Sequence, residues 1–397
     1  MIHNNIFDDT KAAFKTKSNQ ELNRALFLFN TINNKNFVKV GMLLTNLLLR
    51  LRLPVEGLIK KTIFEQFCGG ISEDHCKEVT KEIFKVRVHS ILDYSIEGKE
   101  TEEEFNLILN KKIKLIKFAS ESEEISFCVF KPTGIGRFAV LEKISEGIEL
   151  TLSENKEWER IKDRVDQLCI CAVQHNVRLY ADAEESWIQK AVDDLMEKMM
   201  FKYNKEKVLI FNTLQCYRRD RIEYLENPHK RAKERGFKIG AKIVRGAYME
   251  KENSRAKKHN YLSPICENKE ASDVNFNNVM LYCLTNLEEI SVFIGTHNEV
   301  STFMALKFIE EKEQSIDDER IWFSQLYGMS DNITYNLAEK GYNSSKLVPF
   351  GPVRDVIPYL LRRAQENTSV KGQTGRELFL LKKERARRKA IRSKKVR

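Results

Sequence analysis

Short apolar runs of strand length alternate with longer amphipathic stretches along most of this chain. The runs cover residues 88–94, 125–130, 177–183, 208–213, 241–246, 291–296, 320–325 and 346–351. Between them, segments such as 157–176 and 185–204 have apolar positions at helical spacing. Strands that alternate with helices favour a parallel sheet, and eight such units fit a (β/α)8 barrel in number and length.

A doubly wound open sheet is the structural alternative to the barrel. It would favour a glycine-rich dinucleotide-binding turn after a strand, but no strand-length run is followed by GxGxxG. The TGIG segment at 133–136 lacks the third glycine. We therefore expect an α/β protein of the barrel type.

The first 85 residues have a different pattern and read as helices. Residues 37–53 have helical spacing and end before Pro54, and residues 55–67 form a second candidate helix that stops at Gly69 and Gly70. No catalytic pattern occurs here. We expect an N-terminal helical arm over 1–85, a barrel with the functional site over 86–375, and a basic C-terminal tail over 376–397.

The tail carries most of the formal net charge of +10, because Lys and Arg dominate residues 382–397. A run of this kind binds anionic lipid or nucleic acid, or remains a solvated, frayed end. The N-terminus has no apolar core of a signal peptide, and the longest apolar runs are too short to cross a bilayer. The eight cysteines include no CxxC pair, which indicates a reducing compartment. We expect a cytoplasmic protein, or one peripheral at the inner face of the membrane.

Polar side chains follow most of the predicted strands. In strand order they are Asp93 and Glu97, Lys131, Asp182, Gln215, Lys242 with Arg245 to Tyr248, Thr296 with His297 and Asn298, and Gln325. Because the carboxyl ends of barrel strands converge on one face, these groups are candidates for a shared site. No metal-binding spacing occurs, and the acids of DAEE at 182–185 are interpreted as the start of a helix, so no metal site is expected.

The last helix of the predicted barrel carries a further candidate group. Tyr359, Arg362 and Arg363 share one helical face. Two neighbouring arginines can hold a carboxylate through charge-assisted hydrogen bonds, although arginines on a helix also commonly just face water.

Taken together, the motifs resemble the monofunctional proline dehydrogenase family from about Phe64 to Lys383. The matching segments are LYADAEESW (179–187), NTLQCYRRD (212–220), KIVRGAYMEKE (242–252), GTHN (295–298), QLYGMSD (325–331) and VPFGPVRDVIPYLLRRAQEN (348–367). Their order along the chain is far more specific than any single segment. The resemblance implies a distorted (β/α)8 barrel that binds FAD without a covalent bond.

The resemblance also implies roles for individual residues. Asp182 and Lys242 match the catalytic acid and base positions beside the flavin. The positions that match the substrate-binding residues are Lys131, Tyr248, Leu326, Tyr359, Arg362 and Arg363. The positions that match the flavin contacts are Ala183, Gln215, Lys242, Val244, Arg245, Gly246, Ala247, Thr296 and His297. Glu97 and Arg362 resemble an ion pair that closes the site over substrate.

The implied reaction is the FAD-dependent oxidation of L-proline to Δ1-pyrroline-5-carboxylate, with electrons passed to a membrane quinone. One residue departs from the pattern: Leu347 replaces a Tyr that many members carry and that a branch acting on 4-hydroxyproline lacks. Hydroxyproline oxidation is therefore one alternative. A barrel without catalysis that binds nucleic acid through the basic tail is the other, although we expect no nucleic acid partner.

Overall fold

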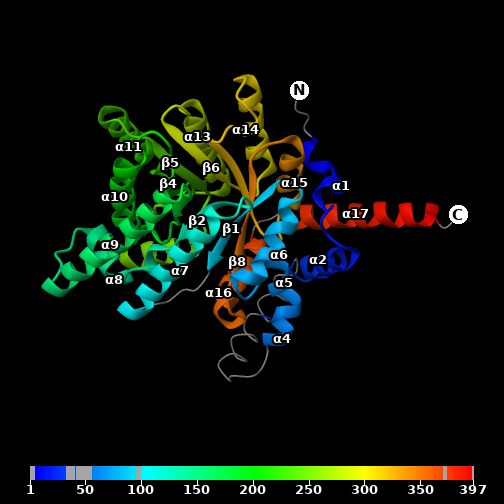
Figure 1. Cartoon of the computed structure of the whole chain (residues 1–397), viewed down its shortest axis with the longest axis horizontal. Coiled ribbons are helices and arrows are strands. Elements are labelled where there is room, and N and C mark those ends of the chain that lie inside the picture. The colour runs from blue at the N-terminus through cyan, green and yellow to red at the C-terminus, as the bar shows by residue number, and fades with distance from the viewer. Residues whose placement is uncertain (1–4, 33–40, 42–55, 95–99, 370–372, 396–397) are drawn as a thin grey trace. The chain divides into compact units, whose positions relative to one another are not determined.

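The computed structural model describes residues 5–32, 41, 56–94, 100–369 and 373–395. Eight strands pair in the order β1 to β8 and close into a barrel, which confirms the predicted (β/α)8 fold and excludes an open sheet. The printed pairs are parallel, and β1 is in register with β8 from Val88 opposite Ser344 to Tyr94 opposite Phe350. Two compact units are distinguished, residues 97–324 and residues 1–96 with 325–397 (Figure 1).

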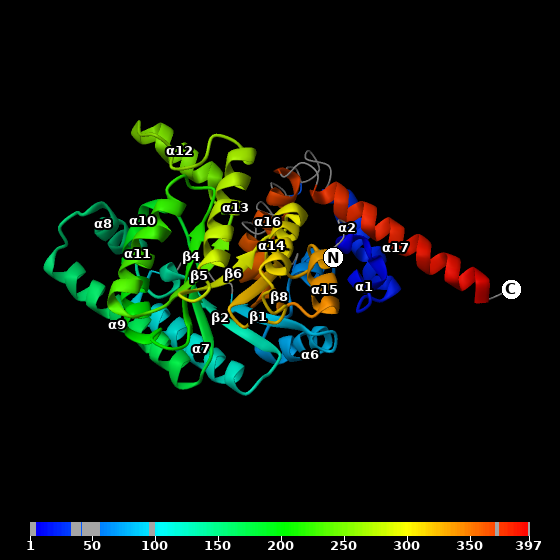
Figure 2. The same cartoon turned by 90° about the horizontal axis from the view of Figure 1, so that it is seen from above.

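The unit of residues 97–324 alternates strands and helices. Its strands are β2 (Ile125–Phe130), β3 (Arg178–Ala181), β4 (Ile210–Gln215), β5 (Ile239–Val244), β6 (Ile290–Gly295) and most of β7 (Ile321–Leu326). Its helices are α7 (Glu102–Ser120), η3 (Pro132–Gly134), α8 (Phe138–Glu146), α9 (Leu152–Gln174), α10 (Ser186–Tyr203), α11 (Arg221–Arg235), α12 (Met249–His259), α13 (Lys269–Thr285) and α14 (Glu299–Glu311). Helices α10, α11 and α13 lie outside β4, β5 and β6 (Figure 2).

Local sequence signals explain where these helices begin and end. Thr101 before α7 and Thr151 before α9 each form a capping box with the Glu three residues later. The end of α8 is Gly147, whose positive φ of 72° is the left-handed conformation that glycine adopts without strain. These helices therefore begin and end at defined residues, and the loops between strands and helices carry polar side chains.

Aromatic rings fill the centre of this unit. The ring of Phe127 on β2 lies 5.3 Å from Phe211 on β4, 4.9 Å from Phe293 on β6 and 5.5 Å from Trp322 on β7. Strands this far apart in the barrel order can share contacts only across its interior. These rings, with Tyr180 of β3, therefore form an internal layer that closes the barrel below the strand ends.

The other unit contains both ends of the chain. Its elements are η1 (Ile6–Asp8), α1 (Thr10–Ala13), α2 (Asn19–Ile32), α4 (Glu56–Ile59), η2 (Lys60–Phe64), α5 (Glu65–Phe67), α6 (Glu73–Phe84), β1 (Val88–Tyr94), α15 (Asp331–Lys340), β8 (Ser344–Phe350), α16 (Val353–Ser369) and α17 (Gln373–Lys395). The expected helix over 37–53 lies outside the described residues, apart from Gly41. The expected helix over 55–67 is present as α4, η2 and α5 in succession.

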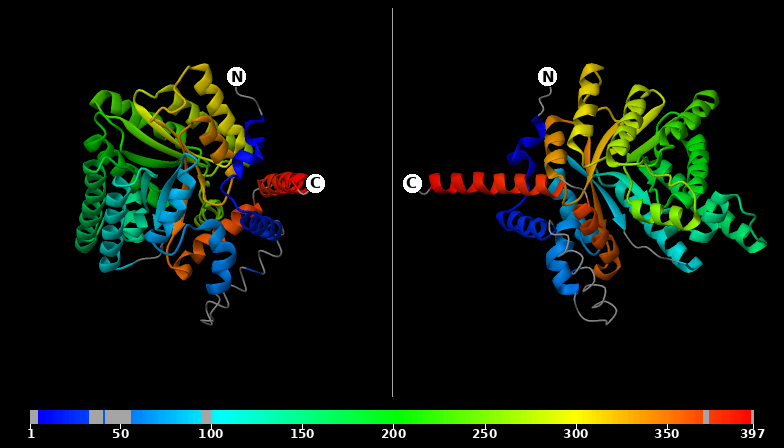
Figure 3. Two further views of the ribbon diagram at one scale, coloured as in Figure 1. Left: turned by 45° about the vertical axis from the view of Figure 1, so that its right-hand side comes forward. Right: turned by 180° about the vertical axis from the view of Figure 1, so that it is seen from behind.

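The basic segment forms a helix rather than an irregular tail. Helix α17 runs beside α2 (Figure 3), and both contribute to one apolar cluster that includes Phe14, Phe29, Leu380 and Leu381. Arg388 of α17 donates to the backbone oxygens of Phe14 and Lys17 at 2.7 and 2.8 Å. Helix α17 is thus packed as far as Arg388, while Lys389, Arg392 and Lys394 beyond it are exposed.

No helix within the described ranges combines the length and the apolar character that a bilayer crossing requires.

Candidate active site

The alternation of side chains along each strand explains why polar side chains lie above the aromatic layer. Residues two or four apart on a strand point to the same face. Lys131 follows Phe127 by four residues, Asp182 follows Tyr180 by two, and Gln215 follows Phe211 by four. The same alternation that buries the rings therefore directs these polar groups toward the carboxyl end of the barrel.

Lys131, Asp182 and Lys242 come together at this end. The two oxygens of the Asp182 carboxylate are 3.3 Å from the Lys131 Nζ and 2.8 Å from the Lys242 Nζ. The Lys242 ammonium also lies 3.9 Å from the centre of the Tyr180 ring, which gives it a cation–π contact. One carboxylate thus bridges two cations from neighbouring parts of the barrel, and the cluster rests on the aromatic layer.

The charges of this cluster determine the protonation of Asp182. Burial alone would raise the pKa of its carboxyl group, but the Lys242 and Lys131 ammonium groups outweigh burial and hold that pKa well below its usual range. Asp182 is therefore an anion at neutral pH. The cluster carries two positive charges and one negative charge, so it favours an additional anionic group nearby.

Arg245 sits at the end of β5 in a second polar network. Its guanidinium donates to Asp273 at 2.7 Å, to the Thr296 hydroxyl at 2.7 Å and to the Ser301 hydroxyl at 2.9 Å. It also lies 4.4 Å from the centre of the Phe276 ring. Contacts from α13, from the end of β6 and from α14 fix the plane of the guanidinium and place it beside Thr296, another of the predicted flavin contacts.

The Gln215 side chain fits a bound flavin, and the residue after Arg245 must be glycine for a packing reason. The Gln215 side chain is 3% exposed, and its Oε1 accepts no hydrogen bond from any of the described residues. Such an orphaned oxygen suits a ring N–H donor of a ligand. Gly246 has a φ of +130°, and a Cβ at this position would lie 2.5 Å from the Tyr217 ring. Only glycine therefore lets the chain after β5 pass this close to Tyr217.

The remaining predicted flavin contacts lie at the ends of the same strands. Ala183 is buried directly after Asp182, and Val244 is the last residue of β5. Ala247 is exposed after Gly246, and His297 is half-buried between β6 and α14. All predicted flavin positions therefore fall in the unit of residues 97–324.

The predicted substrate-binding residues are divided between the two units. Lys131 and Tyr248 belong to residues 97–324, whereas Leu326 ends β7 and three others lie on α16 in the second unit. Tyr359 is buried, and the Arg363 guanidinium lies 5.2 Å from the centre of its ring. Arg362 is half-buried one position earlier. The gate residue Glu97 lies outside the described part of the chain.

The acidic DAEE segment directly precedes a helix, as expected, but its carboxylates also make contacts that the sequence did not indicate. Helix α10 begins at Ser186 with Glu185 before it, and Glu185 pairs with Lys251 at 2.8 Å. Glu184 instead turns back to Thr133, whose backbone N–H and hydroxyl donate to its two oxygens at 3.0 and 2.6 Å. Sequence reasoning missed this contact because the two residues lie in different loops. Among the described residues, no group of three or more His, Cys, Asp or Glu side chains could hold a metal ion.

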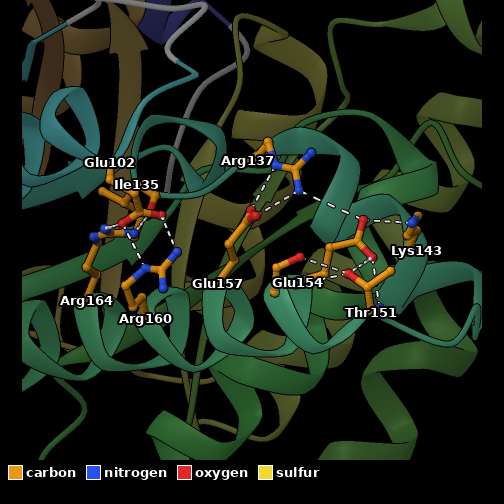
Figure 4. A network of polar contacts seen from close by, with 10 residues as sticks. Glu102, Ile135, Arg137, Lys143, Thr151, Glu154, Glu157, Arg160 and Arg164 are labelled. Carbon is orange, nitrogen blue, oxygen red and sulfur yellow. Dashed lines mark hydrogen bonds and ion pairs between the residues drawn. The ribbon is translucent and has the colours of Figure 1, made fainter.

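A neighbouring network holds the other side of the same turn (Figure 4). Arg164 of α9 donates to the backbone oxygen of Ile135 at 3.1 Å and to the Asn106 side chain at 3.0 Å, and it pairs with Glu102. The loop that carries Lys131 is therefore attached to α9 at one end and to Glu184 near its middle.

Comparison with known proteins gives consistent findings. The sequence model of the family described as proline dehydrogenase matches residues 76–376. The chain is 31% identical to proline dehydrogenase 1, mitochondrial, of Dictyostelium discoideum, over 97% of this chain and 76% of that protein. It is 32% identical to the carbapenem antibiotics biosynthesis protein CarD of Pectobacterium carotovorum subsp. carotovorum, over 84% of this chain and 86% of that protein.

A solved structure shares the fold. The crystal structure of proline utilization A (PutA) from Bdellovibrio bacteriovorus matches with a TM-score of 0.70 and 20% sequence identity. The match covers 91% of this chain but only 38% of the PutA chain. At this identity the likeness concerns the barrel alone, and this chain spans well under half the length of that protein.

Proposed function

The chain belongs to the proline dehydrogenase family, whose members are oxidoreductases acting on proline, and we propose that it oxidises L-proline to Δ1-pyrroline-5-carboxylate with FAD. The observation that carries this proposal is the Lys131–Asp182–Lys242 cluster above the aromatic layer. Gln215 and the segment Arg245–Ala247 are the groups we assign to flavin binding. When bound, FAD would accept the hydride from the ring carbon next to nitrogen.

The cationic groups supply substrate binding in this proposal. We assign Lys131, Arg362 and Arg363 to the substrate carboxylate, and Tyr248, Leu326 and Tyr359 to the walls around its ring. Holding the carboxylate fixes which carbon faces the flavin, because a five-membered ring with one anchored substituent has little orientational freedom left. We also propose that Glu97 pairs with Arg362 when the site closes over the substrate.

Asp182 and Lys242 form the polar floor beneath the reacting ring. The ring nitrogen must lose a proton as the hydride leaves, so the oxidation releases two electrons and two protons in total. The Lys242 ammonium, held by Asp182 and the Tyr180 ring, adds positive potential that favours the neutral amine of the substrate. We therefore propose Lys242 and Asp182 as the catalytic pair.

The absorbance spectrum of the purified protein tests this function. We expect a yellow protein whose flavin band bleaches on addition of L-proline under anaerobic conditions. The alternative, a barrel without catalysis that binds nucleic acid, predicts a colourless protein with salt-sensitive affinity for DNA. A yellow protein that L-proline does not bleach contradicts the proposed substrate.

Leu347 supports one alternative substrate, trans-4-hydroxy-L-proline. Leu347 is half-buried on β8, where its backbone oxygen accepts from the Tyr327 N–H at 2.9 Å. Because it replaces a Tyr that many family members carry, it could leave room for a substituent on the ring. We propose L-proline as the preferred substrate, and a higher kcat/KM for the hydroxylated amino acid would overturn that preference. Other cyclic amino acids belong in the same substrate panel, because a flavin-dependent barrel could act on one of them instead.

We propose a membrane quinone as the electron acceptor, reached by peripheral contact at the inner face of the membrane. The exposed end of α17 beyond Arg388 supports this contact, because Lys389, Arg392 and Lys394 face solvent and attract anionic headgroups. Sedimentation with anionic vesicles tests it. Binding should fall steeply with added salt and be absent for neutral vesicles, and equal binding to both vesicle types would contradict the electrostatic contact.

A further inference from the structure

We propose that Glu184 is a positioning residue that fixes the turn after β2 and thereby keeps the Lys131 ammonium beside Asp182. The inference rests on the proposed function, since it explains how the chain places a cation that we assign to the substrate carboxylate. It assigns a task to a carboxylate that sequence reasoning interpreted as a helix-start residue.

The position of Lys131 depends on a very short turn. Lys131 is the first residue after β2 and precedes the single 3-10 turn Pro132–Gly134. Within the turn, the Gly134 N–H bonds to the Lys131 oxygen at 3.0 Å. A turn of this length has little stability of its own, because few backbone hydrogen bonds hold it. Contacts from outside the turn must therefore set the direction in which Lys131 leaves the strand.

Glu184 provides the contact at the centre of the turn. Both of its oxygens accept from Thr133, one from the backbone N–H at 3.0 Å and one from the hydroxyl at 2.6 Å. Two bonds to one residue fix its orientation as well as its position. Since Thr133 is two residues from Lys131, a shift of this contact moves the backbone that carries the ammonium group.

Glu184 is itself held firmly. Its side chain is 6% exposed, and its backbone N–H donates to Gln189, which in turn donates to Asp193 at 2.8 Å. Burial raises the pKa of the Glu184 carboxyl, and the nearby Lys131 charge and the Thr133 donors act in the opposite direction. A buried carboxylate is stable only with hydrogen-bond donors or positive charges nearby. The bonds from Thr133 therefore also offset the free-energy cost of burying the Glu184 side chain.

Arg164 anchors the other end of the turn independently. Its bond to the Ile135 oxygen comes from α9 (Figure 4). Arg164 thus holds the chain where the turn leaves toward α8, whereas Glu184 acts close to Lys131. The two anchors can be separated experimentally, because Arg164 acts from α9 on Ile135 and Glu184 acts from the loop before α10 on Thr133.

Four variants test the proposal. Glu184→Ala removes both bonds to Thr133, Thr133→Val removes the hydroxyl bond from the opposite side, and Glu184→Gln can keep both bonds without the charge. Glu185→Ala is the matched control, since this neighbouring carboxylate pairs with Lys251 instead. Steady-state kinetics with L-proline are compared with inhibition by tetrahydrofuran-2-carboxylate, which keeps ring and carboxylate but has no amine, and by pyrrolidine, which has no carboxylate.

We expect Glu184→Ala to raise KM and the inhibition constant of the carboxylate about tenfold, the effect of losing an ordinary hydrogen bond. Inhibition by pyrrolidine, kcat and flavin content should change little. Glu184→Gln should recover most of the loss, Thr133→Val should resemble a milder Glu184→Ala, and Glu185→Ala should resemble wild type. Equal losses for the carboxylate and for pyrrolidine, or no change in KM in either Glu184→Ala or Thr133→Val, would overturn the proposal.

A second readout does not depend on turnover. Acetylation of lysines in brief pulses of acetic anhydride, quantified by mass spectrometry, reports the accessibility of Lys131 with Lys242 as the internal reference. We expect Lys131 to react faster in Glu184→Ala and Thr133→Val than in wild type, and Lys242 to stay unchanged. If L-proline neither bleaches the flavin of the wild-type protein nor is oxidised by it, the proposed function is wrong. The labelling of Lys131 then tests the positioning role of Glu184 by itself. Unchanged Lys131 labelling in both variants refutes that role.

Discussion

Replacing Asp182 by Asn removes the anion that two ammonium groups share. At 3.3 and 2.8 Å from Lys131 and Lys242, each pair attracts by about 5–6 kcal/mol for an effective dielectric constant of ~20. Desolvation of the charges cancels much of this, and removal of one partner from a buried pair costs about 3–5 kcal/mol. Because the Asp182 side chain is 22% exposed, we expect a loss near the lower end, about 3 kcal/mol of unfolding free energy.

Urea unfolding of Asp182→Asn at neutral pH measures this loss. Asp166→Asn is the matched control, because Asp166 also lies 2.8 Å from a lysine, Lys202, but has a side chain that is 34% exposed. A solvent-exposed pair of this kind contributes less than about 1 kcal/mol. The comparison therefore keeps the shortest carboxylate–lysine distance constant, while Asp182 is more buried and is shared by two lysines, whereas Asp166 pairs with one lysine and accepts from the Tyr203 hydroxyl.

The loss of unfolding free energy caused by Asp182→Asn should also depend on pH in a defined direction. The pKa of Asp182 is lowered on folding, so its contribution to stability is complete above the unfolded-state value of about 4. It disappears as the pH falls through the folded-state pKa. The difference between wild type and Asp182→Asn should therefore shrink in acid. Equal losses for both variants at pH 7, or a loss for Asp182→Asn that is undiminished at pH 3, would refute the electrostatic account.

Three further changes probe the assigned roles. Gln215→Leu should weaken FAD binding about tenfold, because the buried Oε1 could no longer accept a flavin N–H, and equal retention of FAD on dialysis would contradict this. Arg363→Met should raise the KM for L-proline strongly with FAD still bound; a wild-type KM would remove Arg363 from the carboxylate site. Leu347→Tyr should lower kcat/KM for hydroxyproline relative to L-proline, and an unchanged ratio would show that this position does not set the preference.

Most of the barrel could be predicted because its strands are buried and short. The apolar runs at 88–94 and 125–130 coincide with β1 and β2, while the others are shifted by one or two residues at their ends. The shifts arise where a strand continues into polar residues, as in β8, which begins at Ser344 within a polar stretch. Hydrophobic runs mark which residues face the core, but backbone pairing decides where a strand ends.

The site was predictable only in part. Periodicity and motif order indicated Lys131, Asp182 and Lys242, and their contacts required the fold to bring the ends of β2 and β3 beside β5. Glu184 was assigned to a helix start because a local pattern of acids before a helix is common. Its real partner, Thr133, is 51 residues away in the sequence. Contacts of this range leave no local pattern in a single sequence.

The packing of α17 against the first helices has a consequence for biosynthesis. Phe14 and Phe29 leave the ribosome long before Leu380 and Leu381, their neighbours in the same apolar cluster, are translated. The early helices therefore keep exposed apolar faces until α17 has been translated. Nascent chains of this protein should consequently depend on chaperones that shield such faces during elongation.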